Sequence, residues 1–97
     1  MAQVVYSQAA LDDFERIVEF MLRAEPQSAA PVLHRIRSAV EILSSHPFIG
    51  RRVLGELREL PVSHGRSGYL VLYRVDAALD VVRVLRIRHQ REAGYRE

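Results

Sequence analysis

Hydrophobic positions in the first quarter of the chain recur at helical spacing. The apolar run at residues 3–6 contains β-branched residues and predicts a short strand, and Ser7 after it is a good helix N-cap. Apolar residues then recur every three or four positions: Leu11, Phe14, Val18, Met21 and Leu22. The charged residues between them are Asp12, Asp13, Glu15, Arg16, Glu19 and Arg23. This pattern predicts an amphipathic helix to about Arg23 whose carboxylates form a solvated face.

A second helical pattern follows a short break at residues 25–28. Taking Ser28 as the N-cap places Pro31 in the first helical turn, where its missing N–H is harmless. The second apolar stripe consists of Val32, Leu33, Ile36, Val40 and Leu43. Proline and glycine then end the helix within residues 46–50. Two helices joined by so short a link predict an antiparallel hairpin.

The second half of the chain changes to the pattern of strands. Apolar runs with polar turns between them predict strands at residues 56–62, 69–75 and 81–87. Because proline cannot donate to a strand ladder, Pro61 predicts an edge strand or a bulge. In the last strand, simple alternation places Val82 and Val84 on one face with Arg86 and Arg88, so this face changes from apolar to cationic.

These elements predict one α+β domain spanning residues 1–97. We expect an N-terminal strand and an antiparallel two-helix hairpin. The hairpin should pack on one face of a small, mostly antiparallel sheet that three C-terminal strands complete. The middle predicted strand contains two tyrosines, Tyr69 and Tyr73, which lie on the same face of the strand. For this pair, packing in the core is favoured over stacking on nucleic-acid bases.

Composition excludes several kinds of chemistry. The 97 residues contain no cysteine, so disulfides, zinc fingers and thiol nucleophiles are excluded. The four histidines lack metal-ligand spacing, and we expect neither a metal nor a cofactor. Without a signal-peptide pattern or an apolar run of about 20 residues, we expect a cytoplasmic protein and no membrane partner.

Positive charge is concentrated in the second half of the chain. Residues 1–50 carry four arginines and six acidic residues, whereas residues 51–97 carry ten arginines and six acidic residues. Every basic residue is arginine, which excludes lysine Schiff bases and Walker-type phosphate lysines but suits bidentate contact with phosphate or carboxylate.

The strongest chemical candidate is a cationic and polar cluster after the last predicted strand. It comprises Arg86, Arg88, His89, Arg91 and Tyr95, to which neighbouring loops can add Arg51, Arg52, His64 and Arg66. Arginine, histidine and tyrosine can supply the cation, base and acid that RNA cleavage through the 2′-hydroxyl requires. The competing interpretation is a basic terminus that solvates the sheet end or docks an acidic partner.

Several of these segments, in this order, resemble the RelE/ParE toxin superfamily over nearly the whole chain. The matching segments are residues 10–13, the corner at residues 46–52, and residues 57–60, 69–75 and 84–89. The resemblance implies a toxin of a type II toxin–antitoxin module, neutralised by a small antitoxin. It also implies one of two targets, since ParE-like members poison DNA gyrase and RelE-like members cut mRNA in the ribosomal A site.

The resemblance favours the ParE-like branch, because the long helix hairpin and the Pro-x-x-Gly-Arg corner at residues 47–51 look more like that branch. In the RelE-like alternative, Arg91 resembles a phosphate stabiliser and Tyr95 a base or stacking residue. The catalytic set would then be Arg86, His89, Arg91 and Tyr95. Whichever branch applies, we expect target or phosphate binding by Arg51, Arg52 and Arg66.

The basic half and the edge strand near Pro61 also suit an antitoxin. We expect its bound segment to be acidic and amphipathic and to dock on the apolar side of the helix hairpin that the sheet does not cover.

Overall fold

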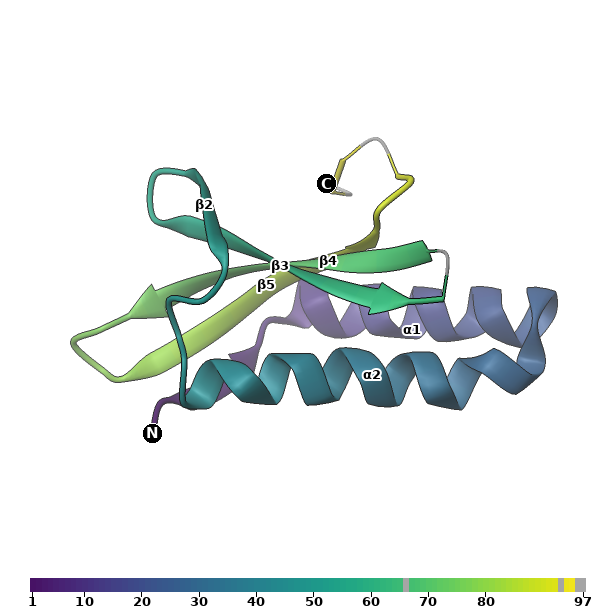
Figure 1. Cartoon of the computed structure of the whole chain (residues 1–97), viewed down its shortest axis with the longest axis horizontal. Helices are drawn as coiled ribbons and strands as arrows, with labels where there is room; N and C mark the ends of the chain where they lie inside the picture. The colour runs from purple at the N-terminus through teal and green to yellow at the C-terminus, as the bar shows by residue number, and fades with distance from the viewer. Residues whose placement is uncertain (66, 93, 96–97) are drawn as a thin grey trace.

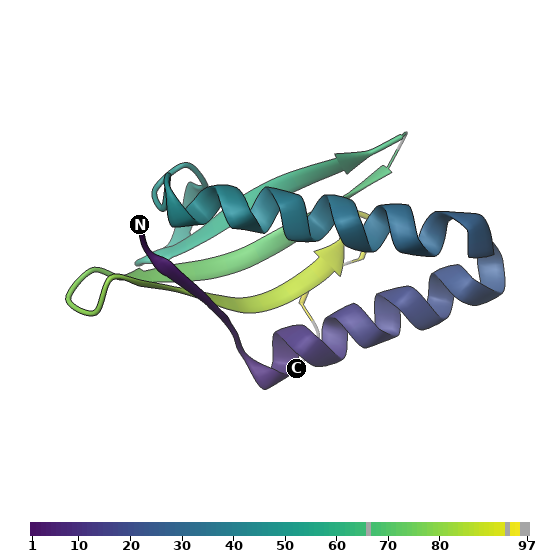
Figure 2. The same cartoon turned by 90° about the horizontal axis from the view of Figure 1, so that it is seen from below.

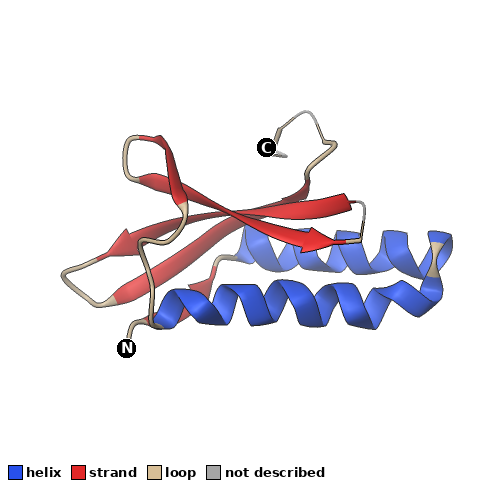
Figure 3. Cartoon of the chain, viewed as in Figure 1, coloured by secondary structure: helices blue, strands red, loops and turns tan. Residues whose placement is uncertain are grey.

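The computed structural model describes residues 1–65, 67–92 and 94–95 and has one layer of helices on one sheet (Figures 1 and 3). The helices are α1 (Gln8–Ala24) and α2 (Ala29–Glu41), and 3-10 turns span Pro26–Ser28 and Ile42–Ser44. The strands are β1 (Gln3–Tyr6), β2 (Arg51–Leu54), β3 (Leu57–His64), β4 (Ser67–Asp76) and β5 (Val81–His89). They form one sheet in the order β1-β5-β4-β3-β2.

The arrangement of layers confirms the predicted α+β class. β1 pairs with β5 in parallel, and the other neighbouring strands are antiparallel. The antiparallel helices α1 and α2 lie side by side over one face of the sheet (Figure 2). After β5 the tail rises to the side of the sheet away from the helices (Figure 1), although Glu92 at its beginning still contacts Arg16 of α1.

Strand β2 is an element that the sequence pattern did not predict. Its four residues are exposed and pair with β3 only as far as Glu59. The outer edge of β3 therefore lacks a strand partner from Leu60 to His64 in the described chain. The edge position predicted for Pro61 is thus confirmed locally, although β3 is an inner strand of the sheet along its first residues.

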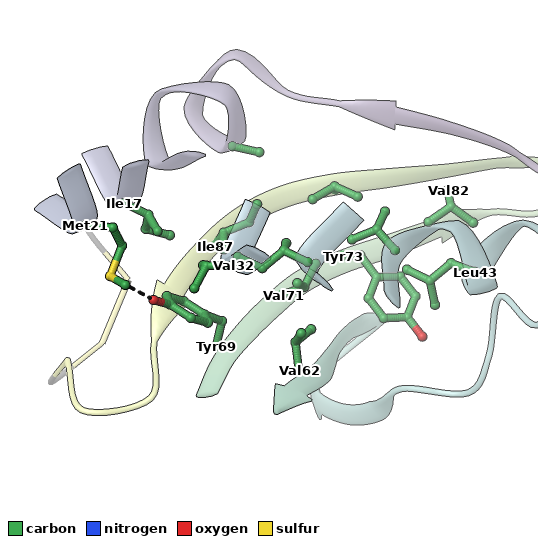
Figure 4. Packing of buried hydrophobic residues seen from close by; sticks show 14 of the residues in the cluster. Ile17, Met21, Val32, Leu43, Val62, Tyr69, Val71, Tyr73, Val82 and Ile87 are labelled. Atoms are coloured by element: carbon green, nitrogen blue, oxygen red, sulfur yellow. Dashed lines mark hydrogen bonds between the residues drawn. The ribbon is translucent and has the colours of Figure 1, made fainter. Parts of the chain in front are cut away.

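The core lies between the sheet and the helix hairpin (Figure 4). Its fully buried side chains include Tyr73, Ile36, Leu43, Ile87, Val32, Val40, Val71, Val82 and Val84. Tyr69 and Tyr73 are both buried there, which confirms core packing for this pair. The Tyr69 hydroxyl points to the Met21 sulfur at 3.9 Å.

The buried face of α1 differs from the predicted face by a rotation about the helix axis. Asp13, Ile17 and Met21 are buried, whereas Leu11 and Leu22 are exposed. The prediction that all the α1 carboxylates are solvated was therefore wrong for Asp13. The physical reason is that β5 offers donors to this carboxylate, so hydrogen bonds compensate its burial.

A bulge in β5 overturns the predicted cationic face. Leu72 is opposite Arg86 and Tyr73 is opposite Val84, so Leu85 is an extra residue in the ladder. The alternation of faces shifts by one at this point, and Ile87 joins Val84 in the core. Val84 and Arg86 therefore do not continue one face of the strand.

Candidate functional site

The beginning of α1 is fixed to the free edge of β5 by two side chains. The Ser7 hydroxyl caps the helix by accepting the N–H of Ala10 at 3.0 Å, and it donates to the Leu85 carbonyl at 2.8 Å. Six residues later, Asp13 accepts the backbone N–H of Ile87 at 2.8 Å. These bonds cover the edge of β5 beyond the end of β1, where β5 has no second strand partner in the described chain.

Asp13 is also the ion-pair partner of Arg86. The Arg86 guanidinium donates from Nε at 2.9 Å and from a terminal nitrogen at 3.2 Å, which makes the contact bidentate. Burial alone would raise the pKa of Asp13. The Arg86 and Ile87 hydrogen bonds and the charges of Arg86 and Arg16 outweigh this effect and hold the pKa below its ordinary value. Arg86 is therefore committed to a structural contact.

Glu92, in the turn after β5, contacts both α1 and the last residue of β5, His89. The Glu92 carboxylate accepts from Arg16 at 3.0 Å and from the N–H of His89 at 3.4 Å. The His89 ring packs edge-on against Tyr69, and its Nδ1 accepts the N–H of Arg91 at 3.0 Å. Burial and the nearby Arg91 charge lower the pKa of His89, against the opposing effect of Glu92. Its neutral form therefore carries the proton on Nε2.

A second network lies on the opposite face of the sheet. Glu59 is buried, accepts the Tyr95 hydroxyl at 2.7 Å, and accepts Arg51 at 2.7 Å. The Arg88 guanidinium lies 5.0 Å from the Tyr95 ring centroid. Burial raises the pKa of the Tyr95 hydroxyl, and the hydrogen bond and charge of Glu59 raise it further, against the opposing effect of Arg88. Tyr95 is thus a neutral donor to a carboxylate at physiological pH.

The structure therefore divides the predicted cluster between two sides of the sheet. His89 is opposite Tyr69 in the ladder and shares its core-facing side. Glu59 and the tyrosine it holds, Tyr95, occupy the other face, because Glu59 alternates with the core residue Val62. Arg86 lies at the sheet edge against Asp13. Arg66, also predicted as a site residue, lies outside the described residues.

A groove of about 960 Å³ collects the members of the cluster that face the helices. It lies between α1 and the ends of β3, β4 and β5, and its titratable lining includes His64, His89 and Arg91. Arg16, Arg23, Glu19, Glu25 and Glu92 also line it, together with apolar side chains such as Phe20. The groove therefore has mixed charge.

The two predicted cations of the corner, Arg51 and Arg52, lie on β2. The Arg51 side chain is 70% exposed although it pairs with Glu59. Arg52 is exposed and donates to the Gly55 carbonyl at 3.1 Å and 3.3 Å. Both guanidinium groups face solvent at the end of the sheet opposite the groove, since β2 pairs with the start of β3 and His64 ends that strand.

Sequence reasoning missed the carboxylates that organise both networks, Asp13 and Glu59. The signal for Asp13 was its four-residue spacing with Ile17 and Met21, which places all three on one helix face. The signal for Glu59 was weaker, because its burial depends on a tail residue, Tyr95, that is distant in sequence.

Over residues 1–65, 67–92 and 94–95, no group of histidine and acidic side chains is arranged to hold a metal ion. Within the same residues, no helix is long and apolar enough to cross a membrane.

Comparison with known proteins gives consistent matches along the chain. Residues 4–94 match the family described as the ParE toxin of type II toxin–antitoxin systems, parDE. Toxin RelE3 of Caulobacter vibrioides is 36% identical over 92 residues, which cover 95% of this chain and 98% of that toxin. Toxin RelE2 of the same organism is 35% identical over 89 residues, covering 92% and 96%.

A solved structure shares the fold at low sequence identity. The chromosomal ParDE system of P. aeruginosa matches with a TM-score of 0.76 at 20% identity, covering 92% of this chain and 96% of that chain.

Proposed function

Because the chain belongs to the ParE toxin family and is a toxin of a type II toxin–antitoxin system, we propose that it inhibits DNA gyrase by binding it. This action is not catalytic: the toxin occupies its target and cuts no RNA.

Most of the candidate catalytic side chains are already held in contacts within the protein, which supports this proposal. Cleavage through the 2′-hydroxyl requires a base, an acid and a cation that face one phosphate. Here Arg86 is paired with buried Asp13, and Tyr95 donates to Glu59 with a raised pKa. The basic nitrogen of His89 accepts a backbone N–H. Since the sheet separates His89 from Tyr95, these groups cannot act together without rearrangement of the tail.

The alternative function is that of a RelE-like, ribosome-dependent mRNA endoribonuclease. The observation in its favour is the groove, which places Arg91 with His64 and His89 on one side of the molecule. In this alternative, Arg91 would contact phosphate and one of the histidines would transfer a proton.

Induction of the toxin alone in bacteria separates the two functions. The gyrase proposal predicts a DNA-damage response while mRNA stays intact during the first minutes of growth arrest. It also predicts that the purified toxin inhibits gyrase supercoiling of plasmid DNA. Codon-phased mRNA cuts that precede DNA damage would overturn the proposal and support the nuclease.

Two substitutions make the same distinction at the level of residues. Arg91→Ala and Tyr95→Phe should leave toxicity unchanged if no catalysis occurs, and Arg35→Ala, at an exposed arginine of α2, is the matched control. Loss of toxicity in both variants, with thermal stability and antitoxin binding retained, would favour the nuclease.

We propose further that the cognate antitoxin docks on the outer side of α1 with an acidic amphipathic segment. Leu11 and Leu22 are exposed on this helix, and an apolar helix face that the sheet does not cover suits helix-in-groove recognition. Leu11→Asp and Leu22→Asp should weaken binding of the co-encoded partner at least tenfold. Leu79→Asp, at an exposed leucine of the β4–β5 turn, should not. A partner that binds through a basic tail would contradict the proposal.

A further inference from the structure

The segment between the second 3-10 turn and the β2–β3 turn exposes an unusual concentration of large hydrophobic side chains. We call residues 48–54 the corner segment. Its exposed hydrophobic residues are Phe48 at 58%, Ile49 at 58%, Val53 at 42% and Leu54 at 74%. No other seven consecutive described residues expose as many. Single exposed hydrophobic residues are ordinary on a protein surface, but a concentration of them marks contact with another molecule.

The core of the protein holds the first part of the corner segment in place. Gly50 is buried, and its N–H donates to the hydroxyl of the fully buried Tyr73 at 2.8 Å. A Cβ at this position would lie 2.6 Å from the Tyr73 ring and 2.9 Å from the Glu59 carbonyl oxygen, so only glycine fits. The chain on either side of Gly50 is therefore fixed against the sheet, and Ile49 is presented outward.

Arg58 fixes the same segment from the neighbouring strand. Its guanidinium donates to the carbonyls of Phe48 at 3.2 Å and Gly50 at 2.8 Å, and it lies 5.1 Å from the Phe48 ring centroid. These contacts order an exposed aromatic side chain, whereas most exposed side chains remain mobile. Ordering a surface before binding reduces the entropy that binding must overcome.

The charges around the corner segment define the partner that would fit it. Arg51, Arg52 and Arg58 lie within or beside it. Their acidic neighbours are Glu56, which is exposed, and Glu59, which is buried and pairs with Arg51. The Arg52 guanidinium donates to the carbonyl oxygen of Gly55 and has no carboxylate partner in the described chain. The surface thus offers apolar contact with a surplus of positive charge at its border.

We propose that the corner segment is the surface through which this toxin docks on its target protein. The target would present an apolar patch bordered by carboxylates. The inference rests on the proposed function, in which gyrase is that target. Figure 1 shows the β2–β3 hairpin curling away from the helix layer, so this surface is separate from the outer side of α1 assigned to the antitoxin.

The test uses two charge-introducing variants of the whole toxin, Ile49→Asp and Leu54→Asp. Both positions are more than half exposed, so aspartate can be solvated while it repels a carboxylate-bordered partner. Leu79→Asp, 64% exposed on the β4–β5 turn, is the matched control. Circular dichroism and thermal unfolding establish that the three variants are folded.

Supercoiling by purified gyrase is the main measurement. The corner variants should require at least tenfold more toxin for half-inhibition than the parent, while Leu79→Asp inhibits like the parent and all three bind antitoxin equally. If the corner variants inhibit as well as the parent, the docking surface is refuted and the gyrase proposal stands.

The other outcomes are also decisive. If the parent toxin fails to inhibit gyrase, the proposed function fails, and growth arrest tests the surface instead. Growth arrest that is lost only in the corner variants supports docking of the corner segment on another target. Growth arrest that the corner variants retain refutes the docking surface. Loss of antitoxin binding with toxicity intact would assign the surface to the antitoxin. A parent dimer that the variants abolish would assign it to a second copy. Either result overturns the inference.

Discussion

Replacing Asp13 by asparagine tests the contact that joins α1 to β5. The buried carboxylate accepts the Ile87 N–H and two donors of Arg86. Asparagine has nearly the same shape, but its amide can accept only through Oδ1, and its NH₂ group would face the guanidinium donors. The substitution therefore removes charge and acceptors while leaving the volume of the core unchanged.

The expected loss of unfolding free energy follows from these contacts. Leaving a buried donor unsatisfied costs about 1–3 kcal/mol, and breaking a fully buried ion pair costs about 3–5 kcal/mol. The Arg86 side chain keeps 19% of its exposure, so water reduces the second cost. We expect Asp13→Asn to lose about 2 kcal/mol and Asp13→Ala about 3 kcal/mol, a large share of the roughly 5–15 kcal/mol typical of a domain.

The loss should depend on pH in a defined direction. Because the folded-state pKa of Asp13 lies below its unfolded value, the carboxylate stabilises the fold above about pH 4. Its contribution disappears as the pH falls through the folded-state pKa. Urea unfolding should therefore show the parent and Asp13→Asn converging at low pH. The pKa of Glu59 is also lowered, but Glu59 is present in both proteins, so the difference between the parent and Asp13→Asn reports on Asp13 alone.

The control for this experiment is the neighbouring Asp12→Asn. Asp12 is exposed and accepts a bond from Gln8 on the helix surface, so its substitution should change stability by less than about 0.5 kcal/mol. Equal stability of Asp13→Asn and Asp12→Asn at pH 7 would refute the reasoning. So would a difference in stability between the parent and Asp13→Asn that does not shrink as the pH is lowered through the folded-state pKa of Asp13.

Three further predictions follow from single contacts. Gly50→Ala should lose about 1–3 kcal/mol by chemical unfolding because its Cβ meets Tyr73, whereas Gly94→Ala, with open space around it, should be near neutral. Tyr73→Phe leaves the buried Gly50 N–H without its acceptor and should lose about 1–2 kcal/mol in the same assay. An NMR titration should give His89 a pKa below about 6.5 and a neutral Nε2–H tautomer; a raised pKa would contradict the hydrogen bond from Arg91.

The sequence predicted the elements that depend on local pattern and missed those that depend on register. The N-cap Ser7, both helices and the three longer C-terminal strands follow from spacing and turn residues. β2 escaped prediction because its four exposed residues carry no alternation of buried and solvated positions.

The bulge at Leu85 shows why alternation alone could not place the candidate site. One extra residue in β5 reverses every later side chain, and no local feature of the sequence marks it. The predicted cluster was contiguous in sequence, but the sheet puts His89 and Tyr95 on different faces. Contacts between distant segments, such as Tyr95 with Glu59, decide which of these groups is available.

The same contacts change the meaning of the basic second half. Its arginines suggest an attraction to nucleic acid, yet Arg51, Arg83 and Arg86 each pair with a carboxylate. Nucleic-acid binding by charge requires cations that are free to replace counterions along the phosphate backbone. A surface whose arginines hold the fold together is better suited to a protein partner, for which shape and apolar contact supply the affinity. The charge counted from the sequence is therefore larger than the charge available for binding a partner. This favours the exposed hydrophobic corner segment as the surface that recognises the target.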